Sequence, residues 1–470
     1  MRFFLCLASF TLAVAADWPQ YRGPNSLGLT DDRNLPVEMG PEKNVVWRAA
    51  VPPGHSSPIL IGPRIFLTAV DLEALFTIAL DRATGRQLWK QECPRPRKEP
   101  YNKTNSPASG TPASDGKIVV SFFGDYGLQA YTVEGKPLWQ LPLGPFNNLN
   151  GHGSSPVIID DLVLLICDQD TGSYYIAVDK NTGKVRYKVE RPETTRGYAT
   201  PTVWRPENGP AELIVPGAYV TTAYELHTGK KLWWAGGMAW QLKGAAVVVG
   251  DRMYLNSWEA GGDTETAPDV EDWAAVSAKF DRDGDGRLSV EEASGAGLRN
   301  AAAVSNYDLN KDNFLDERDW TFLKLHRQAQ NSVLSIQLGG RGDVTKTHVR
   351  WRYRKSLPNC STPLVYKDAL WMVKDGGVLT TLNPENGAVI KQGRIVGALE
   401  PYWASPIGAD GKVYVVSQAG KLAVLKAQGE WEILKVNDLA DEVFATPALG
   451  DGRLYVRTLS TLYAFGLPKQ

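Results

Sequence analysis

The sequence has few of the residues that usually carry metal, redox or nucleophilic chemistry. It contains four cysteines and five histidines in 470 residues. Cys6 lies in the first apolar run, and Cys93, Cys167 and Cys360 are too widely spaced for a disulfide framework or a metal knuckle. We expect small buried thiols, with one disulfide plus a free thiol as the alternative. There is also no G-x-S-x-G elbow, H-E-x-x-H helix, C-x-x-C-H haem site or phosphate-binding loop.

An excess of charge is also missing, since 51 basic residues face 52 acidic ones. We therefore predict no nucleic-acid partner, and we expect a monomer. No apolar run after the first is long enough to span a bilayer. At the start, Arg2 precedes an apolar run that reaches Ala16 and contains the A-x-A sequence Ala13-Val14-Ala15. This pattern predicts a signal peptide, cleaved near Ala15/Ala16, and a secreted or periplasmic protein without a transmembrane segment.

What the sequence does contain is one repeated hairpin, first seen as ALDRATGRQLW at 79–89. Asp81 can accept hydrogen bonds from its own turn, and Gly85 supplies the positive φ of a bulged hairpin. Trp89 offers a broad face for burial between layers. Related copies occupy 177–187 and 223–233. Repetition of such a unit indicates a repeat architecture.

A turn of small residues followed by proline opens each unit, and the units follow at roughly 45-residue spacing, as in four-stranded propeller blades. The turns begin at Ser56, Gly110, Ser154, Ala199, Ser361, Ala404 and Ala445, with a degenerate copy at Gly244. An aromatic residue is expected where most fourth strands end: Trp89, Trp139, Tyr187, Trp233, Trp351 and Trp431. The eighth unit lacks a fourth strand, whereas the strand around Trp47 lacks a unit. We therefore predict an all-β, eight-bladed propeller that this N-terminal strand closes.

The repeat is interrupted in the fifth unit by residues with a helical pattern. We predict a signal peptide over 1–16, an N-terminal arm over 17–43, propeller over 44–258, a small α-helical insertion over 259–330, and propeller again over 331–470.

Inside the insertion, DRDGDGRLSVEE at 281–292 matches the EF-hand calcium loop. Calcium prefers six to eight oxygen ligands, and alternating side chains at loop positions one, three and five supply several of them. Glycine at position six makes the sharp turn, and the glutamate at position twelve closes the site with two oxygens. The predicted calcium ligands are Asp281, Asp283, Asp285, Arg287 through its carbonyl, Ser289 and Glu292.

A second loop at 308–319 has ligands at the same positions but departs twice from the pattern. Asn313 replaces the glycine, which is tolerable because asparagine visits the left-handed region. Asp319 replaces the closing glutamate, so we expect weaker calcium binding here. The predicted ligands are Asp308, Asn310, Asp312, Phe314 through its carbonyl, Asp316 and Asp319.

The face of the ring that carries the insertion also carries the residues just before the small-x-Pro turns. We predict a ligand or partner funnel there. Its candidate residues are His55, His152, Arg196, Tyr198, Trp240, Lys243, Tyr402 and Trp403. Solvated loop residues without a shared task are the alternative.

The hairpin A-x-D-x-x-T-G-x-x-x-W resembles the tryptophan-docking motif of PQQ-like, quinoprotein-type β-propeller repeat proteins. The lead segment WPQYRGPN at 18–25 resembles that of exported bacterial members. The family includes pyrroloquinoline quinone (PQQ) dehydrogenases and propellers that only bind other proteins. The resemblance implies blade packing, and the vicinal cysteine pair of the alcohol dehydrogenases is missing here.

From these observations we expect an exported, calcium-binding, non-catalytic binding or scaffold protein, whose partner is a protein or an extracellular ligand. Calcium is the expected cofactor, and PQQ is not expected. A PQQ-dependent dehydrogenase is one alternative. A polysaccharide-active enzyme that uses Trp240 and Trp403 in the funnel is the other.

Overall fold

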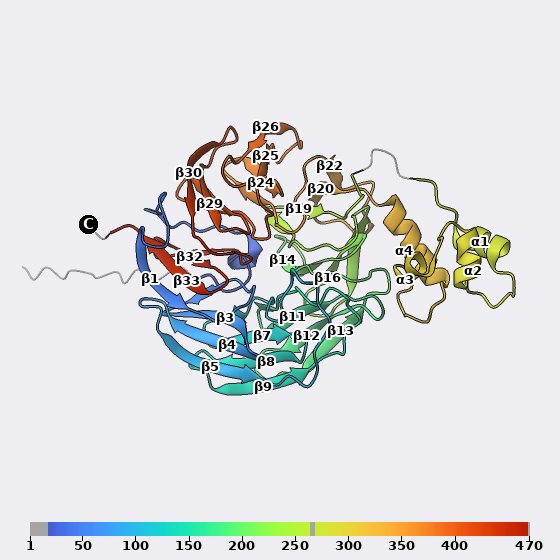
Figure 1. Ribbon diagram of the computed structural model, residues 1–470, viewed down its shortest axis with the longest axis horizontal. Helices are drawn as coiled ribbons and strands as arrows, with labels where there is room; N and C mark the ends of the chain where they lie inside the picture. Colours follow the sequence, from blue (N-terminus) through green and yellow to red (C-terminus); the bar gives the residue numbers. More distant parts are fainter. Residues whose placement is uncertain (1–16, 264–267, 469–470) are drawn as a thin grey trace, which may run out of the picture.

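The computed structural model describes residues 17–263 and 268–468, so the predicted signal peptide over 1–16 lies outside the described residues. The described chain forms eight antiparallel sheets arranged as a ring (Figure 1). Each sheet begins with a short inner strand and continues outward through three further antiparallel strands, and one sheet gains a short fifth strand that is parallel. The prediction of an eight-bladed propeller of four-stranded blades is confirmed.

The strands follow the chain blade by blade. Blade 1 holds β2 (Ile59–Ile61), β3 (Arg64–Asp71), β4 (Ala74–Asp81) and β5 (Gln87–Cys93). Blade 2 holds β6 (Ala113–Ser114), β7 (Ile118–Phe123), β8 (Gly127–Thr132) and β9 (Pro137–Pro142). Blade 3 holds β10 (Val157–Ile159), β11 (Leu162–Cys167), β12 (Tyr174–Asp179) and β13 (Val185–Glu190). Blade 4 holds β14 (Thr202–Trp204), β15 (Glu212–Pro216), β16 (Val220–Glu225) and β17 (Lys231–Gly236), and gains the short parallel strand β21 (Gly342–Asp343).

The second half of the ring repeats this order. Blade 5 holds β18 (Val247–Val249), β19 (Arg252–Ser257), β20 (Ser332–Gln337) and β22 (Val349–Tyr353). Blade 6 holds β23 (Leu364–Tyr366), β24 (Ala369–Lys374), β25 (Val378–Leu382) and β26 (Val389–Arg394). Blade 7 holds β27 (Ile407–Ala409), β28 (Lys412–Val416), β29 (Lys421–Lys426) and β30 (Glu432–Asp438). Blade 8 holds β31 (Ala448–Gly450), β32 (Arg453–Arg457), β33 (Thr461–Gly466) and the N-terminal strand β1 (Val45–Ala50).

Strand β1 closes the ring as predicted. It pairs antiparallel with β33, with Trp47 opposite Ala464. The two strands lie side by side at the edge of the ring in Figure 1. Because β1 pairs with β33, it covers the edge that β33 would otherwise leave unpaired.

The repeated hairpin joins each blade to the next. The Asp81 carboxylate accepts hydrogen bonds from Ala83 and Thr84, which fixes the turn. Gly85 then sits at φ 74°, where a Cβ atom would lie 2.4 Å from the ring of Trp47 in the preceding blade. The Trp47 indole donates to the carbonyl of Arg82 at 3.1 Å. The turn glycine therefore makes room for the indole of the neighbouring blade.

The docking aromatics lie inside their strands or just before them, and not at the strand ends that the sequence pattern suggested. Trp89 is central in β5, and Trp431 precedes β30. The hydrophobic side chains of successive strands fill the spaces between blades in a series of buried clusters. Cys93, Cys167 and Cys360 are all free thiols, which agrees with the expected small buried side chains for the first two.

Between β19 and β20 the described chain forms four α-helices beside the ring (Figure 1). They are α1 (Trp273–Phe280), α2 (Val290–Gly295), α3 (Ala301–Ser305) and α4 (Glu317–Gln328). Their own core includes Val276, Leu298 and Leu323. None of the helices in 17–263 and 268–468 has the length and apolar character needed to traverse a lipid bilayer.

Candidate functional site

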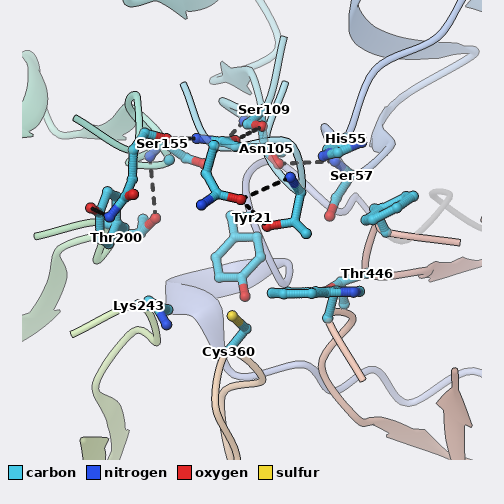
Figure 2. Close-up of a pocket in the computed structure, with 18 of the residues that line it drawn as sticks. Tyr21, His55, Ser57, Asn105, Ser109, Ser155, Thr200, Lys243, Cys360 and Thr446 are labelled. Carbon is cyan, nitrogen blue, oxygen red and sulfur yellow. Dashed lines mark hydrogen bonds between the residues drawn. The ribbon is translucent and has the colours of Figure 1, made fainter. Parts of the chain in front are cut away.

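A cavity of about 510 Å³ lies on the axis of the ring, and all eight blades contribute to its lining (Figure 2). Most of the lining comes from the connections that precede the inner strands. The lining residues are Tyr21, His55, Ser57, Asn102, Thr104, Asn105, Ser109, Thr111, Asn150, Gly153, Ser155, Tyr198, Thr200, Gln241, Lys243, Asn359, Cys360, Trp403, Phe444 and Thr446.

The small-x-Pro turns form a belt of hydrogen bonds around this cavity. In each step a backbone N–H donates to the hydroxyl of the equivalent residue in the next blade. The steps are Ser57 to Thr111, Thr111 to Ser155, Ser155 to Thr200, Ala245 to Thr362, Thr362 to Ser405, and Ser405 to Thr446, at 2.9–3.3 Å. Ala245 has no hydroxyl, so blade 5 donates to this belt but cannot accept from it.

The N-terminal arm closes one end of the cavity. Trp18 pairs with Leu60 in blade 1, while the Asn25 side chain bonds both backbone groups of Val203 in blade 4. Between these contacts the arm, blue in Figure 1, crosses the middle of the ring. The Tyr21 hydroxyl lies 3.1 Å from Ser405 Oγ on the belt. The cavity is therefore a cup, with the arm as its floor.

Arg22 fixes the arm in place. Its guanidinium is fully buried and donates to five backbone carbonyls, those of Ser26, Leu27, Thr362, Pro363 and Pro406. Burial lowers the pKa of Arg22 to about 10, so the side chain stays charged at neutral pH. A cation held by carbonyl dipoles alone needs all of them to remain paired.

One side of the cup is an aromatic shelf. His55 stacks on Phe444 with ring centroids 4.1 Å apart, and Trp403 stacks on the same Phe444 at 6.5 Å. The Trp403 indole donates to Gln418 Oε1 at 2.9 Å, which fixes the ring. Burial, together with nearby Arg457, lowers the pKa of His55 to about 4. The shelf is therefore apolar and uncharged at neutral pH.

A group of side-chain amides forms another part of the lining. Asn105 donates to the carbonyl of Asn150, and Asn150 donates to the Tyr198 hydroxyl at 2.9 Å. Lys243 Nζ lies 2.5 Å from Asn359 Oδ1. Gln241 takes φ 53°, a strained value for this residue, and its amide has no hydrogen-bond partner within the part of the chain that the structure describes.

The lining contains no aspartate or glutamate among the described residues. It therefore offers no carboxyl pair for general acid–base work on a glycosidic bond. Hard oxygen atoms are present in the lining as amide carbonyls and hydroxyls, which calcium accepts as ligands besides carboxylates. Lys243 is the one lysine or arginine in the described lining. Burial raises the pKa of the Cys360 thiol to about 11, which disfavours the thiolate at neutral pH.

Four of the eight predicted funnel residues line the cavity: His55, Tyr198, Lys243 and Trp403. The other four contact residues outside the lining instead. His152 packs against Phe122 and Phe146, and Tyr402 donates to the carbonyl of Ala398. Arg196 pairs with Asp170. Trp240 contacts the insertion through His326, with ring centroids 5.0 Å apart.

Sequence reasoning did not identify Tyr21 or the amides Asn102, Asn105 and Asn150. Tyr21 lies in the N-terminal arm and the asparagines lie in connections between blades, and neither kind of segment has a repeat pattern that would predict its position. One signal was available, because Asn150 stands four residues before the turn at Ser154, as the candidate Trp240 stands four residues before the turn at Gly244.

The two predicted calcium loops have matching geometry. Leu288 and Leu315 form a two-way backbone bridge at 2.8 and 2.9 Å, which joins the loops side by side. In the first loop, carboxylate oxygens of Asp281, Asp283 and Asp285 lie within 4.8 Å of one another. Asn313 takes φ 69° at the position where the first loop has Gly286 at φ 80°.

The carboxylates at loop position twelve differ in their surroundings. Glu292 accepts the backbone N–H groups of Arg282 and Ser289, which lower its pKa to about 2. Asp319 accepts those of Leu309 and Asp316, yet burial raises its pKa to about 7. The shorter side chain is thus more enclosed than its counterpart in the first loop.

The second loop and α4 are parts of the insertion that contact the ring. Asn147, beside the cavity segment that ends at Asn150, donates its amide to the Leu309 carbonyl at 2.8 Å. Arg318 in α4 donates to the carbonyl of Asp170 at 2.8 Å. Leu309 and Phe322 are buried against Tyr219 of blade 4. The insertion is therefore packed on the connections of blades 3 and 4.

Comparison with known proteins supports the fold. A family model described as outer membrane protein assembly factor BamB matches residues 37–170. No curated protein sequence matches the chain. Among solved structures, BamB from Moraxella catarrhalis aligns with a TM-score of 0.54 at 12% identity, over 90% of this chain and 98% of that one.

Two quinoprotein enzymes have the same architecture. Quinohemoprotein alcohol dehydrogenase ADHIIG from Pseudomonas putida HK5 aligns with a TM-score of 0.59 at 10% identity, over 97% of this chain and 81% of that one. A europium-containing methanol dehydrogenase aligns with a TM-score of 0.55 at 12% identity, over 96% and 98%. The fold is thus that of the PQQ-like β-propellers, a class that includes both enzymes and a protein that assists assembly. At these identities the likeness establishes the fold and not the activity.

Proposed function

We propose that this chain is an exported, calcium-binding β-propeller that binds a ligand non-catalytically in its central cup. The observation that carries the proposal is the lining of the cup, which combines amides, hydroxyls and an aromatic shelf without any described carboxylate. Such a lining can orient and hold a ligand, but it lacks the groups that move protons at neutral pH. The likeness to BamB supports a binding role for the fold.

Calcium binding is proposed for both loops of the insertion. The close carboxylates of the first loop and the bridge between Leu288 and Leu315 support two joined EF-hand loops. We expect the first loop to bind more tightly, because Glu292 is longer than Asp319 and can offer two oxygens. The sequence pattern at 1–16 supports export, and an exported protein meets abundant calcium.

Hydrogen bonds connect the second calcium loop to the lining of the cup. Its Leu309 carbonyl accepts from Asn147, and the neighbouring Asn148 accepts from Tyr198, a residue of the lining. Ordering of the loop by calcium would therefore restrain the rim segment 147–150. In this proposal calcium stiffens one wall of the binding site.

Isothermal titration with calcium tests the proposal. We expect at least one site, and its loss in Asp281→Ala combined with Glu292→Gln. Glu291→Gln removes the same charge from the neighbouring exposed residue of α2 and should leave binding unchanged. Absence of calcium uptake by the unaltered protein would overturn the calcium part of the proposal.

A quinone-dependent dehydrogenase is the second candidate, favoured by the structural likeness to two quinoprotein enzymes. Reconstitution with PQQ and calcium, followed by dye-linked oxidation of alcohols and sugars, distinguishes it. We expect no quinone-dependent turnover, because the cup lacks carboxylate ligands. Measurable turnover would replace the binding proposal with this one.

A further inference from the structure

The chemistry of the cup indicates the kind of ligand it takes. Each side-chain amide presents a donor and an acceptor, and each Ser or Thr hydroxyl can act as either. Sugar hydroxyl groups have the same dual character. A lining rich in such groups is therefore matched to a ligand with many hydroxyls and poorly matched to an apolar one.

The shelf supplies the complementary surface. His55, Phe444 and Trp403 form a stacked series, and all three residues line the cup. The C–H face of a sugar ring is flat and apolar, so it packs on such rings while its hydroxyl rim points to the amides. Tyr21 lies among the other lining residues and adds one more hydroxyl to the cup (Figure 2).

The charge of the cup excludes strongly anionic ligands. Lys243 is the one lysine or arginine in the described lining, and it already bonds Asn359 at 2.5 Å. His55 is neutral, since burial lowers its pKa to about 4. A phosphate or a polycarboxylate would lose its hydration without a matching set of cations.

Gln241 adds a further side-chain amide to the lining of the cup. Its side-chain amide is partly buried and has no partner within the described residues, and its backbone takes φ 53°. The next residue, Leu242, is fixed by the Tyr198 N–H, which donates to its carbonyl at 2.9 Å. A strained residue with an unused amide beside a cavity is typical of binding sites.

We propose that the cup binds a neutral carbohydrate, with one sugar ring stacked on the Trp403–Phe444 shelf and its hydroxyls bonded to Gln241 and Asn150. This inference rests on the proposed binding role of the cup and names its ligand class.

The test uses the full exported chain in calcium and measures binding by saturation-transfer NMR and by tryptophan fluorescence. The probes are glucose, galactose, mannose, xylose, N-acetylglucosamine, maltotriose and cellotriose, with glucuronate and glucose 6-phosphate as charged comparators. We expect at least one neutral probe to bind and the charged comparators to bind more weakly.

Two variants locate the ligand. Trp403→Ala should weaken binding by roughly tenfold or more, because it removes the stacking face. Trp234→Ala, on the outer strand β17, is the matched control and should bind as the unaltered protein does. Gln241→Gly removes the amide but also relieves the left-handed backbone, so it should fold normally and still lose about threefold to tenfold in affinity.

The outcomes separate this inference from the proposed function. Calcium uptake with no binding of any probe overturns the carbohydrate inference and leaves the calcium proposal intact. Sugar binding without calcium uptake overturns the calcium proposal and leaves the carbohydrate inference intact. Tighter binding of glucose 6-phosphate or glucuronate, or equal loss in Trp403→Ala and Trp234→Ala, also overturns the inference.

Discussion

The two ends of the central cup are built on different principles. At the floor, the Arg22 guanidinium donates to backbone carbonyls, and none of these partners titrates. At the rim, long connections bring amides, a buried histidine and the calcium loops together. The floor is thus expected to be insensitive to pH and calcium near neutrality, whereas the rim responds to both. In such a binding site the closed end keeps its structure, while the structure of the entrance changes with pH and calcium.

The largest effect should come from breaking the floor. Five backbone carbonyls accept hydrogen bonds from the buried guanidinium, and Arg22→Met leaves them without this donor. We expect a loss of about 4 kcal/mol in the free energy of unfolding. Urea unfolding measures it. Arg33→Met, at an exposed position on the same arm, should change stability by less than about 0.5 kcal/mol. Equal effects of the two variants would contradict the role of Arg22 as the anchor.

The next effect is acid sensitivity at the rim. Burial lowers the pKa of His152 to about 3, and neither ring nitrogen has a hydrogen-bond partner among the described residues. The unfolded chain therefore binds the proton first as pH falls. The contribution of His152 is complete above its unfolded pKa of about 6.5 and is lost as pH falls from there towards 3, by on the order of 3 kcal/mol.

His152→Phe should flatten that pH dependence, because an apolar ring of similar shape fits among Phe122 and Phe146 and does not titrate. Thermal unfolding between pH 4 and pH 7 measures the slope. His227→Phe, at an exposed position, should lose stability at low pH as the unaltered protein does. A slope unchanged by His152→Phe would assign the acid sensitivity to other groups.

A smaller effect is expected from weakening the contact between the rim and the insertion. Leu309→Ala removes a buried side chain from the contact with Tyr219, at a cost of about 2 kcal/mol for docking. We expect faster amide hydrogen exchange over 147–150, with exchange at the arm unchanged. Leu325→Ala, on an exposed part of α4, is the control. Exchange that rises equally at floor and rim would show that the two ends are not independent.

The smallest effect should come from completing the belt between the two ends. Ala245→Ser supplies the hydroxyl that blade 5 lacks, as an acceptor for the Thr200 N–H, and should raise stability by about 0.5–1 kcal/mol. Ala246→Ser places the same hydroxyl in the apolar cluster around Met253 and should lower stability. Calorimetry compares the pair, and a loss in both variants would mean that blade 5 has no room at this position.

The floor and the rim also differed in how far the sequence predicted them. Blade number, ring closure at Trp47 and the joint at Gly85 followed from repetition, because each blade solves the same packing problem. The floor did not follow, since the arm occurs once and its contacts with blades 4, 6 and 7 have no local pattern.

At the rim, the position before each small-x-Pro turn predicted nearness to the axis but not side-chain direction. Tyr198 and Trp403 point into the cup, whereas Arg196 turns to Asp170 and Trp240 to His326. These choices depend on partners far away in the chain. The calcium loops form the opposite case, because a short motif contains all its own ligands, and calcium binding there stays a prediction.

The pairing of β1 with β33 places Val45 opposite Phe465. At a synthesis rate of roughly 5–20 residues per second, the first strand waits on the order of half a minute for its partner to emerge. During that time blade 8 does not exist, and both β1 and the growing end of the propeller present open edges. Completion of the ring therefore depends on pairing between the two ends of the chain, and non-local pairing of this kind slows folding and leaves strand edges exposed until it is made.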